Sequence, residues 1–326
     1  MQRLSWHSMQ WHRLSQMLEN NRLPHAFLLT GPNGVGKLNF VQQLSRSLLC
    51  ESINTLDKPC KQCPSCQLLL NDSHPDHLLL TPEEGKKLIS VDSIRAMIQR
   101  LAQTRHRSKF RTLIIHPADA MTTEAANSLL KTLEEPPAGT LLFLITDKPN
   151  RLLPTIRSRM TRLNFTLPDA LDAIHWFTEL GLSVNESERL LALSLGSPLK
   201  FGDDIKELKH LLEQTDAWWE SWLALIDHSM TPLEAAKQFK AVNPEELLIW
   251  LDLLISAHVH LNNSTELHPA MLGLFPTLDN YKNKFATPIL FQIRDRVLDL
   301  LQRLQSSMNW ELQLESLLLE CSQLNS

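Results

Sequence analysis

The chain has 326 residues, of which 43% are hydrophobic and only 9 are glycine, a composition that supports a full core and two or three domains. Its net charge of −4 is unevenly divided: residues 1–165 carry 21 Lys and Arg against 13 Asp and Glu (+8), and the remainder carries 11 against 23 (−12). The longest apolar runs, such as LLFLI at 141–145, fall far short of the roughly 20 residues of a membrane span, and the N-terminus has no apolar signal segment. We therefore expect a cytoplasmic protein without a membrane segment, in which the basic half can face nucleic acid or simply carry solvated helix surfaces.

Five short apolar runs predict a β-sheet in the first half of the chain. Each is bounded by Pro, Gly, Asp or Asn, and helical patterns lie between them. Continuous apolar strands of this length are typical of a parallel sheet covered on both faces. The runs are AFLLT (26–30), HLLLT (77–81), TLIIH (112–116), LLFLIT (141–146) and RLNF (162–165).

The first predicted strand leads directly into GPNGVGKL, residues 31–38, which fits seven of the eight positions of a phosphate loop. Gly31, Gly34, Gly36 and Lys37 are the candidate phosphate-binding residues. The eighth position needs a Ser or Thr hydroxyl for Mg²⁺, and Leu38 has none. Loop amides and a helix N-terminus bind anions without Mg²⁺. Two interpretations therefore stay open: phosphate or nucleotide binding without turnover, and a vestigial loop kept for its fold.

Four cysteines follow the next helix, at Cys50, Cys60, Cys63 and Cys66. Closely spaced thiolates that converge from a turn suit tetrahedral Zn²⁺, and four sulfur ligands leave no open position for water. This spacing predicts a structural zinc site. The fifth cysteine, Cys321, stands alone and is expected to be a small buried hydrophobic residue.

Four histidines in the same half of the chain raise the question of a second metal site. The HPDH segment lies on a turn that enters a strand, and isolated histidines are usually hydrogen-bonded structural residues. We therefore do not predict a metal site from them. They are His74, His77, His106 and His116.

Strand patterns end near residue 170, and helical patterns replace them. Within the preceding α/β half, a helix is expected over 122–136, with a Thr cap at its start and a double proline at its end. Further helices are expected at 207–228, 231–241, 244–262, 288–305 and 309–324, with a tryptophan cluster at Trp218, Trp219 and Trp222 assigned to core or inter-helix packing. The expected domains are 1–166, 167–206 and 207–326.

The order of these features resembles the clamp-loader subunits of bacterial replicative DNA polymerase, which are AAA+ proteins. The resemblance covers essentially the whole chain and is carried by RLPHAFLLTGPNGVGK, the four-cysteine insert, NSLLKTLEEPP, LPTIRSRM and GSPLKF. It implies an α/β AAA+ module with a RecA-like parallel sheet and a zinc-binding insert (50–66), then a small helical lid and an all-α collar. It also implies a five-membered ring with gamma/tau-type ATPase subunits and the delta subunit. Such a ring acts on the sliding clamp and primed DNA.

The comparison with active ATPase relatives shows four departures. The relatives have Asp-Glu where this chain has His116 and Pro117, an arginine where it has Leu199 (Lys200 is one residue further on), and a loop hydroxyl where it has Leu38. Metal-assisted phosphoryl transfer needs charge neutralisation and an oriented nucleophile. We therefore expect no ATPase activity from this chain, although the resemblance implies that it is a subunit of a DNA-directed DNA polymerase complex.

One catalytic element is retained. The relatives carry a Ser-Arg-Cys motif whose arginine enters a neighbouring subunit's ATP site, and this chain has Ser158, Arg159 and Met160 there. A planar, permanently charged guanidinium suits contact with phosphate oxygens. The resemblance thus implies that Arg159 is an arginine finger, with Arg157 as the competitor and the Cys-to-Met change as a packing difference.

The expected function is a non-hydrolysing, finger-donating clamp-loader subunit. One alternative is an active clamp-loader ATPase with unusual motif residues, which turnover by the purified chain would reveal. The other is a zinc-containing DNA-binding module, which salt-dependent DNA affinity of the isolated chain would favour.

Overall fold

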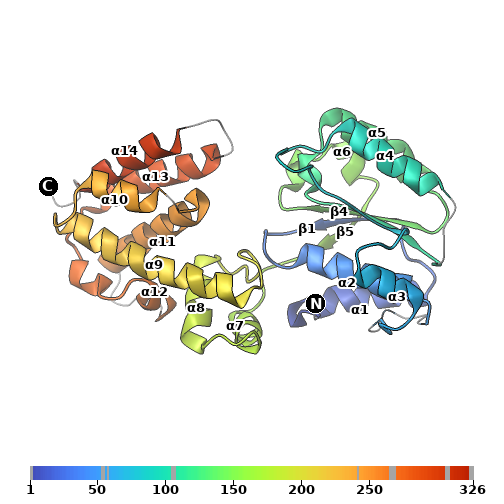
Figure 1. Ribbon diagram of the computed structural model, residues 1–326, viewed down its shortest axis with the longest axis horizontal. Helices are drawn as coiled ribbons and strands as arrows, with labels where there is room; N and C mark the ends of the chain where they lie inside the picture. The colour runs from blue at the N-terminus through green and yellow to red at the C-terminus, as the bar shows by residue number, and fades with distance from the viewer. Residues whose placement is uncertain are drawn as a thin grey trace. The chain divides into compact units, whose positions relative to one another are not determined.

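The computed structural model describes residues 3–52, 56, 59–103, 108–240, 242–263, 269–304 and 309–322. The chain divides into two compact units, residues 1–172 and 173–326 (Figure 1). The first is an α/β unit and the second is helical.

A five-stranded parallel sheet forms the centre of the first unit, as the apolar runs predicted. Its order is β2-β3-β4-β1-β5, so β1 pairs with both β4 and β5. The predicted strands are all present, with ends that differ by one residue at most. The strands are β1 (Ala26–Thr30), β2 (His77–Leu80), β3 (Arg111–Ile115), β4 (Thr140–Thr146) and β5 (Thr161–Asn164). Because all strands are parallel, the loops after β1, β3 and β4 meet at one edge of the sheet.

Helices cover both faces of this sheet (Figure 1). Side chains alternate along each strand, so Phe27 and Leu29 pack in one core with α1 (Ser8–Glu19) and α2 (Lys37–Leu49). Leu28 packs in the other core with α4 (Val91–Ala102) and α5 (Thr123–Glu134). Burial on both faces explains why the central strands β1, β3 and β4 are largely apolar.

Short elements connect these helices and strands. The predicted cap of α5 is confirmed, because the Thr122 side chain accepts a hydrogen bond from the amide of Ala125. The short elements are η1 (Ser5–His7), α3 (Pro64–Leu70), η2 (Ala118–Ala120), η3 (Pro149–Arg151) and α6 (Pro154–Arg157).

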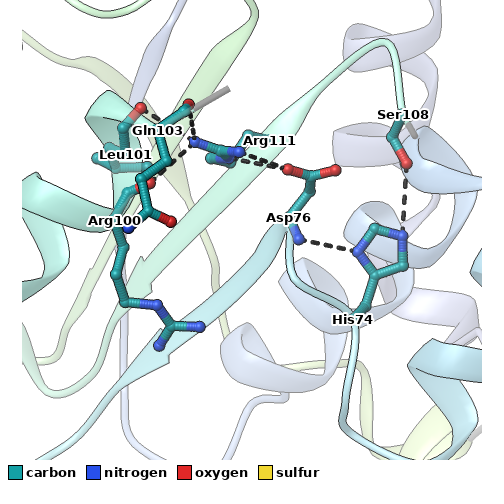
Figure 2. A network of polar contacts seen from close by, with 7 residues as sticks. All are labelled: His74, Asp76, Arg100, Leu101, Gln103, Ser108 and Arg111. Carbon is teal, nitrogen blue, oxygen red and sulfur yellow. Dashed lines mark hydrogen bonds and ion pairs between the residues drawn. The ribbon is translucent and has the colours of Figure 1, made fainter. Parts of the chain in front are cut away.

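A buried ion pair lies at the amino-terminal ends of β2 and β3 (Figure 2). The phosphate loop follows the carboxyl end of β1, at the opposite ends of these parallel strands. Arg111, at the start of β3, donates from Nε and Nη2 to Oδ1 of Asp76 at 2.9 and 2.7 Å. Its Nη1 donates to three carbonyl oxygens at the end of α4, those of Arg100, Leu101 and Gln103. A helix C-terminus leaves its last carbonyls without partners and carries partial negative charge. One guanidinium therefore joins the starts of β2 and β3 to the end of α4.

Replacing Asp76 with Ala is expected to destabilise this unit strongly. Both side chains of the pair are buried, at 3% and 0% exposure, and removal of one partner from a buried ion pair costs about 3–5 kcal/mol. Urea unfolding should show this loss in the free energy of unfolding. The matched control is Asp92→Ala, since Asp92 and Arg95 form an exposed pair on α4 and such pairs contribute about 1 kcal/mol or less. Equal stabilities of the two variants would contradict the assignment.

The histidines near this network have structural roles. His74 accepts a hydrogen bond at Nδ1 from the amide of Asp76 at 3.0 Å, and its Nε2 lies 3.4 Å from the Ser108 hydroxyl (Figure 2). His77 pairs with the Thr112 hydroxyl at 2.9 Å. His106 lies outside the described residues. The hydrogen-bonded roles expected of His74 and His77 are therefore confirmed.

The second unit is built from helices around one large apolar core. The predicted packing role of the tryptophans is confirmed: Trp218, Trp219 and Trp222 are all buried, and Trp218 lies edge-on to Trp250 at a centroid distance of 5.8 Å. Cys321 is buried in this core, as expected, and burial raises the pKa of its thiol. The helices are α7 (Ala170–Glu179), α8 (Val184–Leu193), α9 (Ile205–Ile226), α10 (Pro232–Phe239), α11 (Pro244–Asn263), α12 (Pro269–Leu274), η4 (Leu278–Tyr281), α13 (Thr287–Arg303) and α14 (Trp310–Ser322).

The long helices match the predicted ranges, whereas α12 was not predicted. A capping box starts α10, in which Thr231 and Glu234 bind each other's backbone amides. Phe177 and Leu190 share the apolar core with Leu212, and the division of this unit into lid and collar stays a prediction. Within the ranges given above, no helix combines the length and hydrophobicity of a membrane span.

Candidate functional site

The phosphate loop connects β1 to α2, as the motif requires. All three of its glycines have positive φ angles, at 143° for Gly31, 78° for Gly34 and 90° for Gly36. Gly31 also passes so close to β5 that a Cβ atom would lie 2.1 Å from the carbonyl oxygen of Phe165. Only glycine combines this backbone conformation with this close approach.

Lys37 turns back onto its own loop. Its Nζ donates to the carbonyl oxygens of Gly31 and Pro32 at 2.7 and 2.5 Å, and the residue is 6% exposed. Burial lowers the pKa of this lysine to about 8, while the negative charges of Asp147 and Asp119 act in the opposite direction. The structure thus brings the four predicted loop residues together, with the ammonium group already bonded to the loop.

The N-terminal segment supports the outer side of the loop. Trp6 Nε1 and His7 Nε2 both donate to the carbonyl oxygen of Val35, at 3.1 and 2.8 Å. Burial lowers the pKa of His7 to about 4, so the ring is neutral near pH 7. It lies edge-on to Phe40 and Phe165 at centroid distances of 5.5 and 5.0 Å. The loop conformation is therefore fixed from outside by aromatic packing and two hydrogen bonds.

The end of β3 lies beside this loop and carries no carboxylate at the two positions of the relatives' acidic pair. His116 and Pro117 occupy them, and burial, followed by the charge of Lys37, lowers the pKa of His116. The carboxylate of Asp119, two residues beyond, accepts a hydrogen bond from the Thr146 hydroxyl at 2.6 Å. A neutral imidazole and a proline cannot hold Mg²⁺ and activate water as an acidic pair does.

The four predicted cysteines converge into one cluster. All four Sγ atoms lie within 4.8 Å of one another. Cys50 and Cys63 are 4.0 Å apart, and Cys60 and Cys66 are 3.9 Å apart, measured between Sγ atoms. A tetrahedral zinc with Zn–S distances of 2.3 Å separates its sulfur ligands by about 3.8 Å. The cluster therefore has the size that a four-thiolate zinc site needs.

Backbone amides donate hydrogen bonds to three of the four sulfur atoms of the cluster. Cys60 Sγ accepts hydrogen bonds from the amides of Gln62 and Cys63, and these bonds lower the pKa of its thiol to about 6. Cys63 Sγ accepts from the amide of Cys66, and Cys50 Sγ accepts from the amide of Cys60. Amide donors aimed at sulfur favour the deprotonated ligand form. The cluster can hold a metal ion.

Arg159 projects from the turn between α6 and β5. Its guanidinium is bonded to Glu134 at the end of α5 and to the carbonyl oxygen of Thr155, with 38% of the side chain exposed. Ser158 is exposed, and its hydroxyl donates to the same carbonyl oxygen at 3.1 Å. Met160 is buried in the core that α4 and α5 cover. The arginine is thus on the surface while the next residue anchors the turn.

Known proteins of one family are similar to this chain in sequence. Residues 6–169 match a family described as "DNA polymerase III, delta subunit". The delta-prime subunit of Escherichia coli DNA polymerase III is 35% identical over 239 residues, which span 70% of this chain and 71% of that protein. The chain belongs to the delta-prime family. The Pseudomonas aeruginosa delta-prime subunit is 39% identical over 196 residues, 60% of this chain and 58% of that protein.

A solved structure has a fold similar to that of this chain. A gamma subunit-related protein of Thermotoga maritima is similar with a TM-score of 0.50 at 18% identity, covering 97% of this chain and 100% of that protein. This likeness concerns the fold alone. It agrees with the expected AAA+ module followed by a helical region.

Two contacts around Arg159 and the phosphate loop could not be predicted from the sequence. Glu134 lies 25 residues before Arg159, and the Val35 carbonyl lies 28 residues after His7. No periodicity or motif spacing relates residues so far apart. The composition of TLEEPP places Glu134 at a helix end, but its partner is visible only in the folded chain.

Proposed function

We propose that this chain is a delta-prime-type clamp-loader subunit that does not hydrolyse ATP. In this proposal it joins gamma/tau-type ATPase subunits and a delta subunit in a five-membered ring in the bacterial cytoplasm. The ring loads the sliding clamp on primed DNA at the expense of ATP. Membership of the delta-prime family supports this assignment.

The observation that carries the non-hydrolysing role is the loss of the acidic pair at the end of β3. His116 and Pro117 stand there, and Leu38 provides no hydroxyl beside the loop. Phosphoryl transfer depends on Mg²⁺ that such groups hold and on a water that they orient. Lys37, which would contact the terminal phosphates, is bonded to Gly31 and Pro32. The loop retains amides that can bind an anion, or it is vestigial; turnover is not expected in either case.

Arg159 is proposed as the finger that this subunit supplies to a neighbouring ATP site. Its exposure and the burial of Met160 beside it support the role. Arg157 is less suited, because it is more buried and its Nη1 lies 3.5 Å from Asn150. An arginine offered from outside stabilises the charge that develops on the transferred phosphoryl group.

The cysteine cluster is proposed to hold one structural Zn²⁺. Cys50, Cys60, Cys63 and Cys66 would be its ligands, and a bound zinc would join the end of α2 to the start of α3. With four protein ligands the metal has no position for substrate. The zinc therefore has no catalytic step in this proposal.

Purified protein is expected to hydrolyse no ATP above background, even with Mg²⁺ and primed DNA. The reason is the absence of a metal-binding acidic pair and loop hydroxyl. Steady-state phosphate release measures it, with Lys37→Ala as the control for contaminating ATPases. Turnover of about 0.1 per second, well below typical kinase rates, that disappears in Lys37→Ala would contradict the proposal.

Reconstitution tests the function as a whole. The chain is mixed with gamma/tau-type and delta subunits, and complex formation and DNA-stimulated ATP hydrolysis are measured. Incorporation of one copy into an active clamp-loading complex is expected. Failure to assemble, together with tight, salt-dependent DNA binding by the chain alone, would favour the DNA-binding alternative.

A further inference from the structure

We propose that Glu134 is a positioning residue that fixes the direction of the Arg159 guanidinium. The proposal rests on the finger role assigned to Arg159 above. Glu134 is the last residue of α5 and Arg159 lies at the turn before β5, so the fold brings them together from different elements. Their contact holds two of the three guanidinium nitrogens of the exposed arginine.

Two nitrogens of the Arg159 guanidinium bind the same carboxylate oxygen of Glu134. Arg159 Nε and Nη2 donate to Oε1 of Glu134 at 2.9 and 2.7 Å. Nη1 donates to the carbonyl oxygen of Thr155 at 3.0 Å. The guanidinium is thereby held at all three nitrogens, which fixes both its position and its plane.

The held guanidinium still has capacity for a phosphate group. A guanidinium has five N–H donors, and the three bonds to Glu134 and Thr155 use three of them. One N–H remains on each of Nη1 and Nη2 among the contacts of the described residues. Arginine binds phosphate oxygens through paired N–H groups. Glu134 can therefore orient the finger without using up its donors.

The backbone beside Arg159 is fixed by packing and a hydrogen bond. Glu134 therefore limits the conformational freedom of the Arg159 side chain alone. Ile156 and Met160 are buried on either side, and the Arg159 amide donates to the Ile156 carbonyl at 3.1 Å. A free arginine side chain has considerable rotamer entropy, which is lost when the guanidinium is held in one place. Fixing the side chain beforehand lowers what a catalytic contact in the neighbouring site must overcome.

Stability of the fold does not account for the placement of Glu134. Side-chain exposures of 38% and 52% make this a surface pair, and such pairs contribute little to the stability of a fold. A carboxylate at a helix C-terminus is moreover disfavoured by the helix dipole. Orientation of the Arg159 guanidinium therefore explains the position of Glu134 better than stabilisation of α5 does.

A double-mutant cycle in the reconstituted complex tests the proposal. The complexes contain unmutated chain, Glu134→Ala, Arg159→Ala or both substitutions, and the ATP-dependent kcat and KM are measured with DNA and clamp. The finger-dependent rate is the part lost in Arg159→Ala. Freeing one side-chain torsion spreads the guanidinium over roughly three staggered wells. Glu134→Ala should therefore lower the finger-dependent kcat by about threefold or more, with KM unchanged.

The controls separate positioning from structure. Glu135→Ala removes the neighbouring exposed carboxylate and should change nothing, and Glu134→Gln keeps an acceptor oxygen and should restore most of the rate. In the Arg159→Ala background Glu134→Ala should have no effect. An equal loss in both backgrounds, no loss, or a faster rate would overturn the inference. If Arg159→Ala itself leaves the rate unchanged, the finger role falls, whereas a loss in Arg159→Ala with none in Glu134→Ala overturns the positioning role alone.

Discussion

Complexes that contain Arg159→Ala should assemble normally and lose much of their DNA- and clamp-stimulated ATP hydrolysis. The side chain lies on the surface, and its pair with Glu134 is exposed, so its removal costs the fold about 1 kcal/mol or less. At the ATP site that it would serve in the proposed role, a finger is worth roughly 10³ to 10⁵ in rate by analogy with GTPases. The loss for the whole complex is smaller, since other ATP sites in the ring do not use this residue. Hydrolysis and clamp loading by complexes of matched composition measure it.

Arg157→Ala is the matched control for this prediction. It removes the same charge two residues away, from a side chain that is directed to Asn150. Thermal unfolding of both variants shows whether either one has lost structure. Clamp loading at the unmutated rate by Arg159→Ala complexes would mean that Arg159 is only a surface residue.

The strands were predictable from sequence because burial on both faces leaves a continuous apolar run between turn residues. Phe27, Leu28 and Leu29 all enter one of the two cores, which is the condition that such a run indicates. Helix starts were predictable where a side chain caps the backbone, as Thr122 and Thr231 do. The short helix α12 spans only six residues, Pro269–Leu274, too few for a helical period to stand out in the sequence.

The functional contacts were less predictable, because they join residues that are distant in sequence. The loop motif placed Lys37 near phosphate, but its bonds to Gly31 and Pro32 depend on the folded backbone. The pairing of Arg159 with Glu134 depends on how α5 packs beside α6. The cysteines were the exception, since three of them lie within residues 60–66 around the start of α3 and Cys50 immediately follows α2.

Gently purified protein should contain one zinc per chain, and Cys63→Ser should remove it. The Sγ atoms lie close enough to share one tetrahedral ion, and loss of one ligand opens the coordination shell to water. Structural zinc contributes about 10–16 kcal/mol of apparent binding free energy in small peptides. Here a bound metal would join only a local segment to a larger core. Chelation should therefore raise hydrogen exchange over residues 59–70 and leave the strands protected.

Cys321→Ser is the matched control for the zinc prediction, because it changes a thiol that is buried in the helical unit. That variant should keep one zinc per chain while losing some stability through the buried hydroxyl. Metal analysis of the unmutated protein and both variants, with hydrogen exchange before and after chelation, separates a site from an unspecific thiol effect. A chain purified without zinc, or Cys63→Ser with unchanged zinc content, would contradict the assignment. Loss of protection in β1 and β4 on chelation would instead mean that the metal stabilises the whole α/β unit, since these strands lie at the centre of its sheet.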